Sequence, residues 1–273
     1  MMSSPVVRLT LRGVLARKFR ILLTILAVVS GVAFVSGAFI LTDSVKGAIN
    51  NLFVELRGEV DLEIRTKIAF GDAARAERDP VGISLMKDIA ALDGVRLVEA
   101  NLLRQATIIK SDGEPLQTSG PAFGISWTGP DGLDGRTLLE GVVPTKSGEV
   151  AIDKASAKRA GYVLNDKVTL VGPIGKGEFT LVGLTGTGST SGGGGASVSA
   201  FDPITANEFL GADNKADSIY VGLTSDAARG DVQKAIEEVL PSDYEVITGE
   251  QSAQETAGAI NEIIDIFGKV LLG

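Results

Sequence analysis

The chain has 273 residues, of which 44% are hydrophobic, and it carries 34 acidic and 26 basic side chains. It contains neither cysteine nor histidine. Their absence excludes disulfides, thiol chemistry, Ser-His-Asp and Cys-His catalysis and the usual zinc sites, and it removes the commonest general base at neutral pH. The composition therefore argues strongly against an enzyme.

The charges are distributed unevenly along the chain. Five basic residues and no acidic residue lie among the first 42, so the remainder has a net charge of about −13. Nucleic acids and anionic lipid surfaces attract basic proteins. We therefore expect no nucleic-acid partner, and no electrostatic docking of this acidic remainder onto anionic lipid.

Residues 21–42 form a run of 22 residues without a charge. As an α-helix this run would reach about 33 Å, enough to cross a hydrocarbon core of about 30 Å while satisfying every backbone polar group. The basic residues precede it and Asp43 follows it, so the positive-inside rule predicts a cytoplasmic N-terminus and an exported remainder. We predict an uncleaved transmembrane helix, surrounded by the lipid of the plasma (inner) membrane. The alternatives are a signal peptide, whose apolar region is usually about 7–15 residues, and a buried soluble helix.

The residues before and within this run suggest further membrane contacts. Residues 1–20 place apolar and basic side chains at helical spacing, which predicts a cytoplasmic amphipathic segment at the membrane interface, with an unstructured basic leader as the alternative. Inside the run, Ala27 and Gly31, and likewise Ala33 and Gly37, are small residues four apart. Such pairs let transmembrane helices approach closely, so they hint at partner helices.

Two apolar stripes of helical period flank the middle of the chain. The first predicts a stalk helix over 43–57, and the second predicts a return helix over 250–273 that enters a second transmembrane span. We expect the two to form an antiparallel stalk, although each could instead pack on its own part of the globular region. The stripes consist of Val45, Ile49, Leu52 and Leu56, and of Ala253, Ala257, Ile260, Ile264, Phe267 and Leu271.

The region between the stripes predicts an α+β fold. Two β-α-β patterns, in residues 58–109 and 216–248, can complete one split sheet, which makes 110–215 an inserted, β-rich subdomain. The first pattern has strands at 61–65 and within 95–109 around a helix at 83–92. The second has strands at 218–223 and 244–247 around a helix at 226–240. The insertion has strands at 149–152, 167–171 and 178–182 and helices at 154–160 and 203–209, the last with Asp202 as cap and Pro203 in its first turn.

No motif that carries chemistry survives inspection. The segment 172–177 lacks the spacing and the Ser or Thr of a phosphate-binding loop, and 185–195 is rich enough in Gly, Ser and Thr to predict a mobile loop. Asp61 and Glu63 share one face of a strand, where we expect them to be solvated. The sequence thus predicts no catalytic residue, no cofactor-binding residue and no metal ligand.

One local pattern is more specific. Residues 138–170 read LLEGVVPTKSGEVAIDKASAKRAGYVLNDKVTL, and together with the segments described above they resemble an ABC transporter permease of the FtsX/MacB type, including its MacB-like extracytoplasmic core domain. In that family a G-x-x-P segment precedes an E-V-x-(I/L) strand, an Ala-rich helix and a turn into a further strand. Asn165 stands where Gly is commoner in the family. The matching residues are Gly141, Pro144, Glu149, Val150, Ala157, Gly161, Asp166 and Val168.

The resemblance implies a permease subunit with a porter-like subdomain that binds no ATP itself. It implies a separate cytoplasmic ABC ATPase, and a second permease half or protomer that contacts this chain through transmembrane helices. Substrates in the family include lipids, lipoproteins, peptides and drugs, and some members signal across the membrane instead. Such permeases carry further transmembrane helices, so we expect this sequence to be the N-terminal part of a longer protein. The alternatives are a single-pass, membrane-anchored binding or scaffolding protein and a membrane-anchored hydrolase that uses carboxylates.

Overall fold

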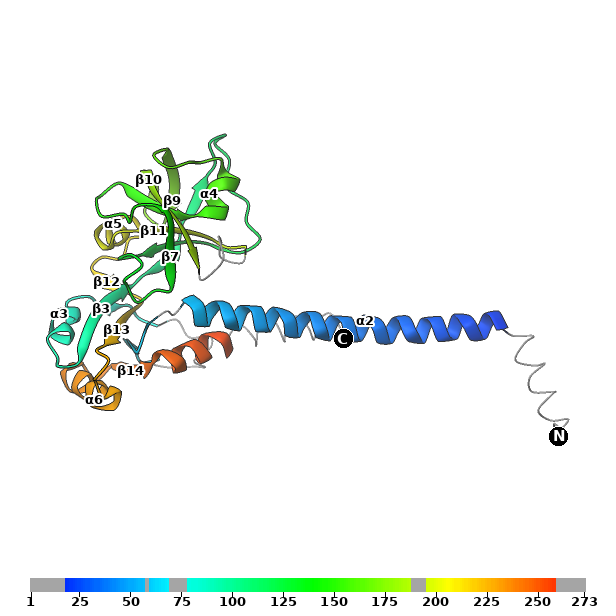
Figure 1. Ribbon diagram of the computed structural model, residues 1–273, viewed down its shortest axis with the longest axis horizontal. Helices are drawn as coiled ribbons and strands as arrows, with labels where there is room; N and C mark the ends of the chain where they lie inside the picture. Colours follow the sequence, from blue (N-terminus) through cyan, green and yellow to red (C-terminus); the bar gives the residue numbers. More distant parts are fainter. Residues whose placement is uncertain (1–17, 57–58, 69–77, 188–194, 259–273) are drawn as a thin grey trace. The chain divides into compact units, whose positions relative to one another are not determined.

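A computed structural model of the chain describes residues 18–56, 59–68, 78–187 and 195–258 (Figure 1). The chain divides into two units, one made of Met1–Ile49 with Ile260–Gly273 and the other of Asn50–Ala259. Most of the predicted amphipathic segment 1–20, and residues 259–273 of the predicted return helix, lie outside the described residues.

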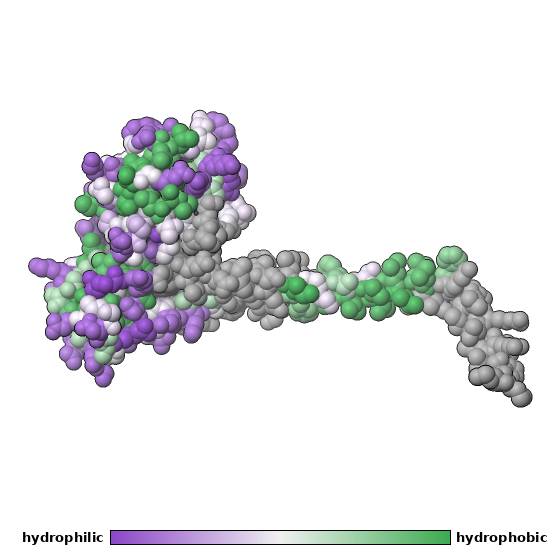
Figure 2. Space-filling model, in the orientation of Figure 1, coloured by the Kyte–Doolittle hydropathy of each residue, from purple (hydrophilic) through white to green (hydrophobic). Residues whose placement is uncertain are grey.

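A single helix, α2 (Lys18–Leu56), contains both the predicted transmembrane run and most of the predicted stalk segment 43–57. Its side chains are described without interruption over 22–37, where the apolar ones are exposed (Figure 2). In the described part of the chain, no helix has the combined length and apolarity needed to cross a membrane. The transmembrane span at 21–42 therefore stays a prediction. The stripe from Val45 to Leu56 has no described side chains, so its pairing with the return helix also stays a prediction.

One of the two main sheets is built from both ends of the larger unit (Figure 1). Its order is β14-β1-β13-β3, and every neighbouring pair is antiparallel. Strands from both predicted β-α-β patterns therefore lie side by side, although more than a hundred residues separate the patterns in sequence. The strands are β1 (Leu62–Thr66), β3 (Val95–Asn101), β13 (Ser218–Leu223) and β14 (Tyr244–Thr248).

Helices α3 (Leu85–Ala90) and α6 (Arg229–Val239) supply apolar side chains to the core of this sheet. Ile89 from α3 and Ile236 from α6 pack there with Leu62, Ile64 and Val221, and all five are fully buried. Both helices are shorter than the sequence pattern predicts. A separate pair, β2 (Val81–Gly82) and β12 (Lys215–Ala216), forms a small two-stranded sheet.

The second sheet has eight strands and curls on itself. Its order is β4-β6-β11-β8-β10-β9-β5, with β7 paired to β10. Strands β4 and β5 are separated in sequence by Ala106 alone, yet they occupy opposite ends of this order, so one continuous segment closes the curl. The strands are β4 (Leu103–Gln105), β5 (Thr107–Ile109), β6 (Ala122–Ser126), β7 (Arg136–Gly141), β8 (Glu149–Asp153), β9 (Lys167–Gly172), β10 (Gly175–Thr187) and β11 (Ser197–Phe201).

This closure corrects one expectation. The sequence analysis assigned residues up to 109 to the split subdomain, whereas 103–109 pair with strands of the curled sheet. The alternating pattern of that segment is the same in either sheet, and only distant partners decide between them.

The curled sheet surrounds a core in which three rings meet. Phe179, Phe201 and Phe209 have ring centroids 4.7–5.4 Å apart in tilted and edge-on arrangements, which aromatic pairs prefer. Phe209 ends α5 (Pro203–Phe209), whose cap is Asp202, as predicted; its carboxylate accepts two backbone N–H groups at 3.1 Å. Helix α4 (Lys154–Ala160) begins after a similar cap.

The two Gly-rich segments are structural in different ways. Residues 172–175 form the turn that joins β9 to β10, with Gly172 paired to Gly175. The start of the predicted mobile loop is wrong, because Thr185 and Thr187 end β10 and are buried between β7 and β8. The rest of that loop, 188–194, lies outside the described residues.

Candidate functional site

Strand β1 is buried on both faces. This is unusual for a strand that contains Glu63 and Arg65 and directly follows Asp61. Leu62 and Ile64 point into the apolar core, while Glu63 and Arg65 on the other face are only 6% and 8% exposed. The expectation of a solvated carboxylate is therefore wrong for Glu63. Local alternation predicted the strand correctly, but it could not show that a distant segment covers the polar face.

That segment is a helix over residues 249–258. The Ser252 hydroxyl donates a hydrogen bond to the Glu63 carboxylate. On the same face, the Arg65 guanidinium lies 2.6 Å from a carboxylate oxygen of Glu255. Glu63 and Arg65 lie on a central strand of the four-stranded sheet. Each of them is thus bonded to the helix that follows the last strand of this sheet.

The start of this helix is fixed in place. Thr248 and Gln251 form a reciprocal capping box, with hydrogen bonds of 2.9 and 3.1 Å. A Cβ atom at Gly249 would lie 2.0 Å from the carbonyl oxygen of Val60, so only glycine allows the helix to begin this close to β1. The Gly249 N–H also donates to the Asp61 carbonyl at 3.0 Å.

A second ion pair on the sheet reinforces Arg65. Glu245 lies opposite Arg65 in the register of β14 and β1, and its carboxylate is 2.8 Å from Arg65 Nε. The same oxygen is 2.8 Å from Arg78 Nη1, which also donates to the Thr66 carbonyl. Opposite charges directly across two strands stabilise their pairing, and this pair was the one sequence signal that could have revealed the site.

A further contact joins α6 to the same helix. Arg229 lies 3.1 Å from Glu250 and 3.5 Å from Asp61, whose other oxygen accepts the Leu223 N–H at 2.8 Å. A hydrogen bond from its own backbone N–H, followed by contacts with Thr248 and Arg229, lowers the pKa of Glu250. This carboxylate therefore stays charged to lower pH than an ordinary glutamate.

These groups form what we call the helix-anchoring network: Asp61, Glu63, Arg65, Arg78, Arg229, Glu245, Glu250, Ser252 and Glu255. Removing one partner of a buried ion pair leaves a desolvated charge and typically costs about 3–5 kcal/mol. For Arg65 the cost is at the lower end, because Glu255 is 44% exposed and solvent screens it. The network therefore holds the helix and β1 together as one mechanical element. Among the described residues, no group of three or more metal-ligating side chains could hold a metal ion.

The motif in 138–170 has a structural explanation at each position that the geometry constrains. Gly141 has φ +81°, and an added Cβ would lie 2.2 Å from the Val182 carbonyl oxygen of β10. The Glu149 carboxylate accepts the N–H groups of Thr145 and Lys146 at 2.9 and 3.1 Å, which closes the turn before β8. Pro144 is buried in that turn.

The second half of the motif ends α4 and starts β9. Gly161 caps the helix with φ +80°, and Asp166 accepts the Val163 N–H at 2.9 Å. Asn165 has φ +73°, a left-handed backbone that glycine and asparagine tolerate better than other residues. Three motif residues are buried in the core of the curled sheet: Val150, Ala157 and Val168.

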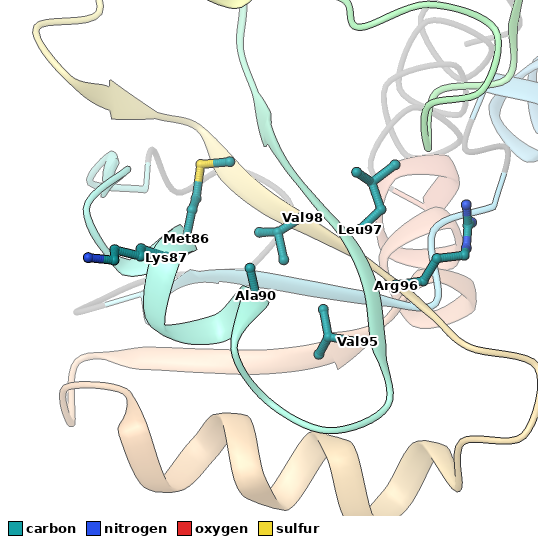
Figure 3. Close-up of a pocket in the computed structure, with 7 residues that line it drawn as sticks. All are labelled: Met86, Lys87, Ala90, Val95, Arg96, Leu97 and Val98. Carbon is teal, nitrogen blue, oxygen red and sulfur yellow. The ribbon is translucent and has the colours of Figure 1, made fainter.

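A cavity of about 350 Å³ between α3 and β3 offers little chemistry (Figure 3). Ala90, Val95 and Val98 form its apolar wall, whereas the charged ends of Lys87 and Arg96 extend in different directions. No set of polar groups converges there to orient a ligand, which a specific small-molecule site needs.

The fold is similar to that of solved domains from two transporters. The chain is similar to the crystal structure of the periplasmic region of MacB from Actinobacillus actinomycetemcomitans, with a TM-score of 0.55, 16% identity, and coverage of 73% of this chain and 93% of that one. It is also similar to the extracellular domain of the noncanonic ABC-type transporter YknZ from Gram-positive bacteria, with a TM-score of 0.49, 14% identity, and coverage of 68% and 98%.

The sequence profile of the MacB-like periplasmic core domain matches residues 21–239. The chain therefore belongs to the family of MacB-like periplasmic core domains, which confirms its resemblance to ABC transporter permeases of the FtsX/MacB type. A comparison with curated protein sequences gives no match.

Proposed function

We propose that the chain is the N-terminal part of an ABC transporter permease subunit. In this proposal, residues 21–42 anchor it in the plasma (inner) membrane with the N-terminus in the cytoplasm, and the domain formed by 59–258 lies outside. A separate cytoplasmic ATPase hydrolyses ATP, and the resulting movement reaches the extracytoplasmic domain. The substrate class would be a lipid, lipoprotein, peptide or drug, or the movement itself would act as a transmembrane signal.

The helix-anchoring network is the observation that carries this proposal. Five residues separate the end of α2 from the start of β1, and the helix over 249–258 leads toward the predicted return span. The two segments that would connect the domain to the membrane therefore meet at one ion-paired strand. A displacement of either segment would move the four-stranded sheet as a unit, because breaking a buried ion pair costs more free energy than moving it intact.

The two sheets have different roles in this proposal. We propose that the segments 58–102 and 216–248 receive the movement. The insertion 110–215, with its closing strand segment 103–109, would present a surface to the substrate or to a partner. The core clusters support this division, since the four-stranded sheet packs around one cluster and the curled sheet around two others.

The test follows the extracytoplasmic domain during ATP turnover. The complete permease that contains this chain is placed in proteoliposomes with its ATPase. One cysteine is introduced at Lys176, an exposed position at the start of β10, in a chain that otherwise has no cysteine. We expect ATP to change the rate at which a maleimide labels this cysteine. Arg65→Met should reduce that change, while Lys154→Met, which removes an exposed ion pair with Glu140, should not.

A labelling rate that never responds to ATP, in a complex whose ATPase is active, would refute coupling. The alternative of a membrane-anchored binding or scaffolding protein would then explain the acidic domain better. If ATP changes labelling equally in the parent and in Arg65→Met, coupling stands, but the helix-anchoring network does not transmit it.

A further inference from the structure

A second cavity, of about 340 Å³, lies where the two sheets of the larger unit meet. Glu59 and Arg96 border it from the side of the four-stranded sheet, and residues 130–137, which lead into β7, border it from the other side. We call it the junction cavity. Its volume is near the lower end of the range of about 300–1,000 Å³ that small-molecule sites occupy.

Arg136 is the distinctive residue of the junction cavity. Its side chain is only 4% exposed, and its Nε is buried without a hydrogen bond. The nearest carboxylate oxygen, on Asp134, lies 3.7 Å from that nitrogen, beyond hydrogen-bonding distance. Arg136 thus keeps only this longer ion pair with Asp134, and at least one of the five N–H donors of its guanidinium is buried without a hydrogen bond.

The other charges around the cavity already have partners. Arg96 and Glu59 pair with each other at 2.7 Å, and Asp134 accepts the backbone N–H of Arg136 at 2.7 Å. Burial raises the pKa of Asp134. Asp131, the third acid, is exposed to solvent. Among the charged residues that border this cavity, Arg136 is the one with a buried side-chain nitrogen that has no hydrogen bond.

The wall that carries Arg136 is held in place before any ligand binds. Glu99 on β3 accepts the Leu133 N–H at 2.9 Å and the Thr128 hydroxyl. The Glu59 N–H donates to the Leu133 carbonyl at 3.2 Å. A binding group on such a fixed loop loses little conformational entropy when a ligand arrives.

We propose that the junction cavity binds an oxyanion, the phosphate or carboxylate group of a small molecule, through the guanidinium of Arg136. The planar fork of N–H groups on arginine matches two oxygens of either anion, and such charge-assisted pairs are about twice as strong as neutral hydrogen bonds. Because residues from both sheets border the cavity, a bound anion would also favour one arrangement of the loop 130–137 against β3. The proposal does not depend on the transport function.

The test uses the only tryptophan in the chain, Trp127, which is 2% exposed and lies three residues before the cavity loop begins at Pro130. The 273-residue chain in detergent is titrated with inorganic phosphate and, separately, with acetate, while sodium chloride keeps the ionic strength constant. Trp127 fluorescence and isothermal titration calorimetry report binding. We expect saturation by at least one of the two anions, and the one that saturates identifies the group as phosphate or carboxylate.

The variants separate binding from folding. Arg136→Met should abolish saturation, and Arg136→Lys, which keeps the charge but loses the fork, should weaken it by at least about tenfold. Arg159→Met, at an exposed arginine of α4, should leave the affinity unchanged. Failure of both anions to saturate in the parent chain would overturn the proposal. So would unchanged affinity in a folded Arg136→Lys variant, or an equal response to added sodium chloride alone.

Discussion

Replacing Gly141 by alanine should destabilise the domain far more than the same change at Gly148. Both glycines have a left-handed backbone, with φ of +81° and +83°. A residue with a Cβ atom in that region costs roughly 1–2 kcal/mol. An added Cβ at Gly148 meets no atom within 4 Å, whereas at Gly141 it would lie 2.2 Å from the Val182 carbonyl oxygen and 3.0 Å from Leu164.

The crowding at Gly141 adds a second cost. Val182 belongs to β10, which pairs with three other strands, so its carbonyl cannot move away without disturbing the sheet. Overpacking of this kind costs typically about 1–3 kcal/mol. We therefore expect Gly148→Ala to lose about 1–2 kcal/mol and Gly141→Ala about 2–5 kcal/mol.

Thermal unfolding of the full chain, followed by circular dichroism, measures the difference. For a domain of 150–250 residues, 1 kcal/mol shifts the Tm by roughly 2–4 °C. Gly141→Ala should thus melt about 2–12 °C below Gly148→Ala. Equal Tm values for the two variants would refute the claim that this glycine of the family motif is fixed by contact with β10.

Three further changes test other parts of the structure. Arg65→Met should lower the free energy of unfolding by about 2–3 kcal/mol. Lys154→Met, at an ion pair whose two partners are both about half exposed, should lower it by less than about 1 kcal/mol. Urea denaturation compares the two variants, and equal losses would contradict a buried anchoring role for Arg65. Asp134→Asn should gain stability relative to the parent as the pH rises from about 3 to 7. Burial raises the pKa of the Asp134 carboxyl, so this group contributes stability below its usual pKa near 3.8 and loses that contribution as the pH passes the higher folded value. A stability difference that does not change with pH would show that the folded pKa is not raised. Tyr162→Phe removes a 2.7 Å hydrogen bond to the Ile109 carbonyl and should lower the free energy of unfolding by about 1 kcal/mol, measured by urea denaturation. An unchanged free energy would mean that water replaces this bond.

Local sequence signals predicted the elements whose causes are local. The helix at Pro203–Phe209 was predicted with its boundaries and its Asp202 cap. The two signals for its start, the capping aspartate and the proline in the first turn, are adjacent in the sequence. The helix at Lys154–Ala160 was also predicted with its boundaries. The glycine-rich segment at 172–175 forms the turn between β9 and β10.

Features that depend on distant partners were beyond the sequence. Glu63 reads as a surface acid, and only the helix over 249–258, almost 190 residues later, makes it a buried one. The segment 103–109 reads as a continuation of the strand from Val95, and only its pairing with β6 and β9 assigns it to the curled sheet. Arg136 gave no sequence signal at all, because its burial depends on a loop that Glu99 holds from the other sheet.

Several residues of the family motif act on the fold rather than through their position on the surface. Gly141, Glu149, Gly161, Asn165 and Asp166 all act on the backbone, through φ values or hydrogen bonds to N–H groups. They fix turns of the inserted subdomain and leave its surface side chains unconstrained. The surface can therefore differ between permeases that handle different substrates, while the fold stays the same.

The most direct measurement of the central claim, an anchored subunit with an exported domain, is the accessibility of single cysteines in intact cells. The chain has no cysteine of its own, so a label reports only the introduced position. We place one cysteine at Lys176, an exposed position at the start of β10, and in a second variant one at Ser4, and we apply a membrane-impermeant maleimide. The account predicts that the cysteine at 176 is labelled in intact cells and the cysteine at 4 only after permeabilisation. Labelling at 4 with protection at 176 would reverse the topology, and release of the chain from washed membranes would contradict the anchor.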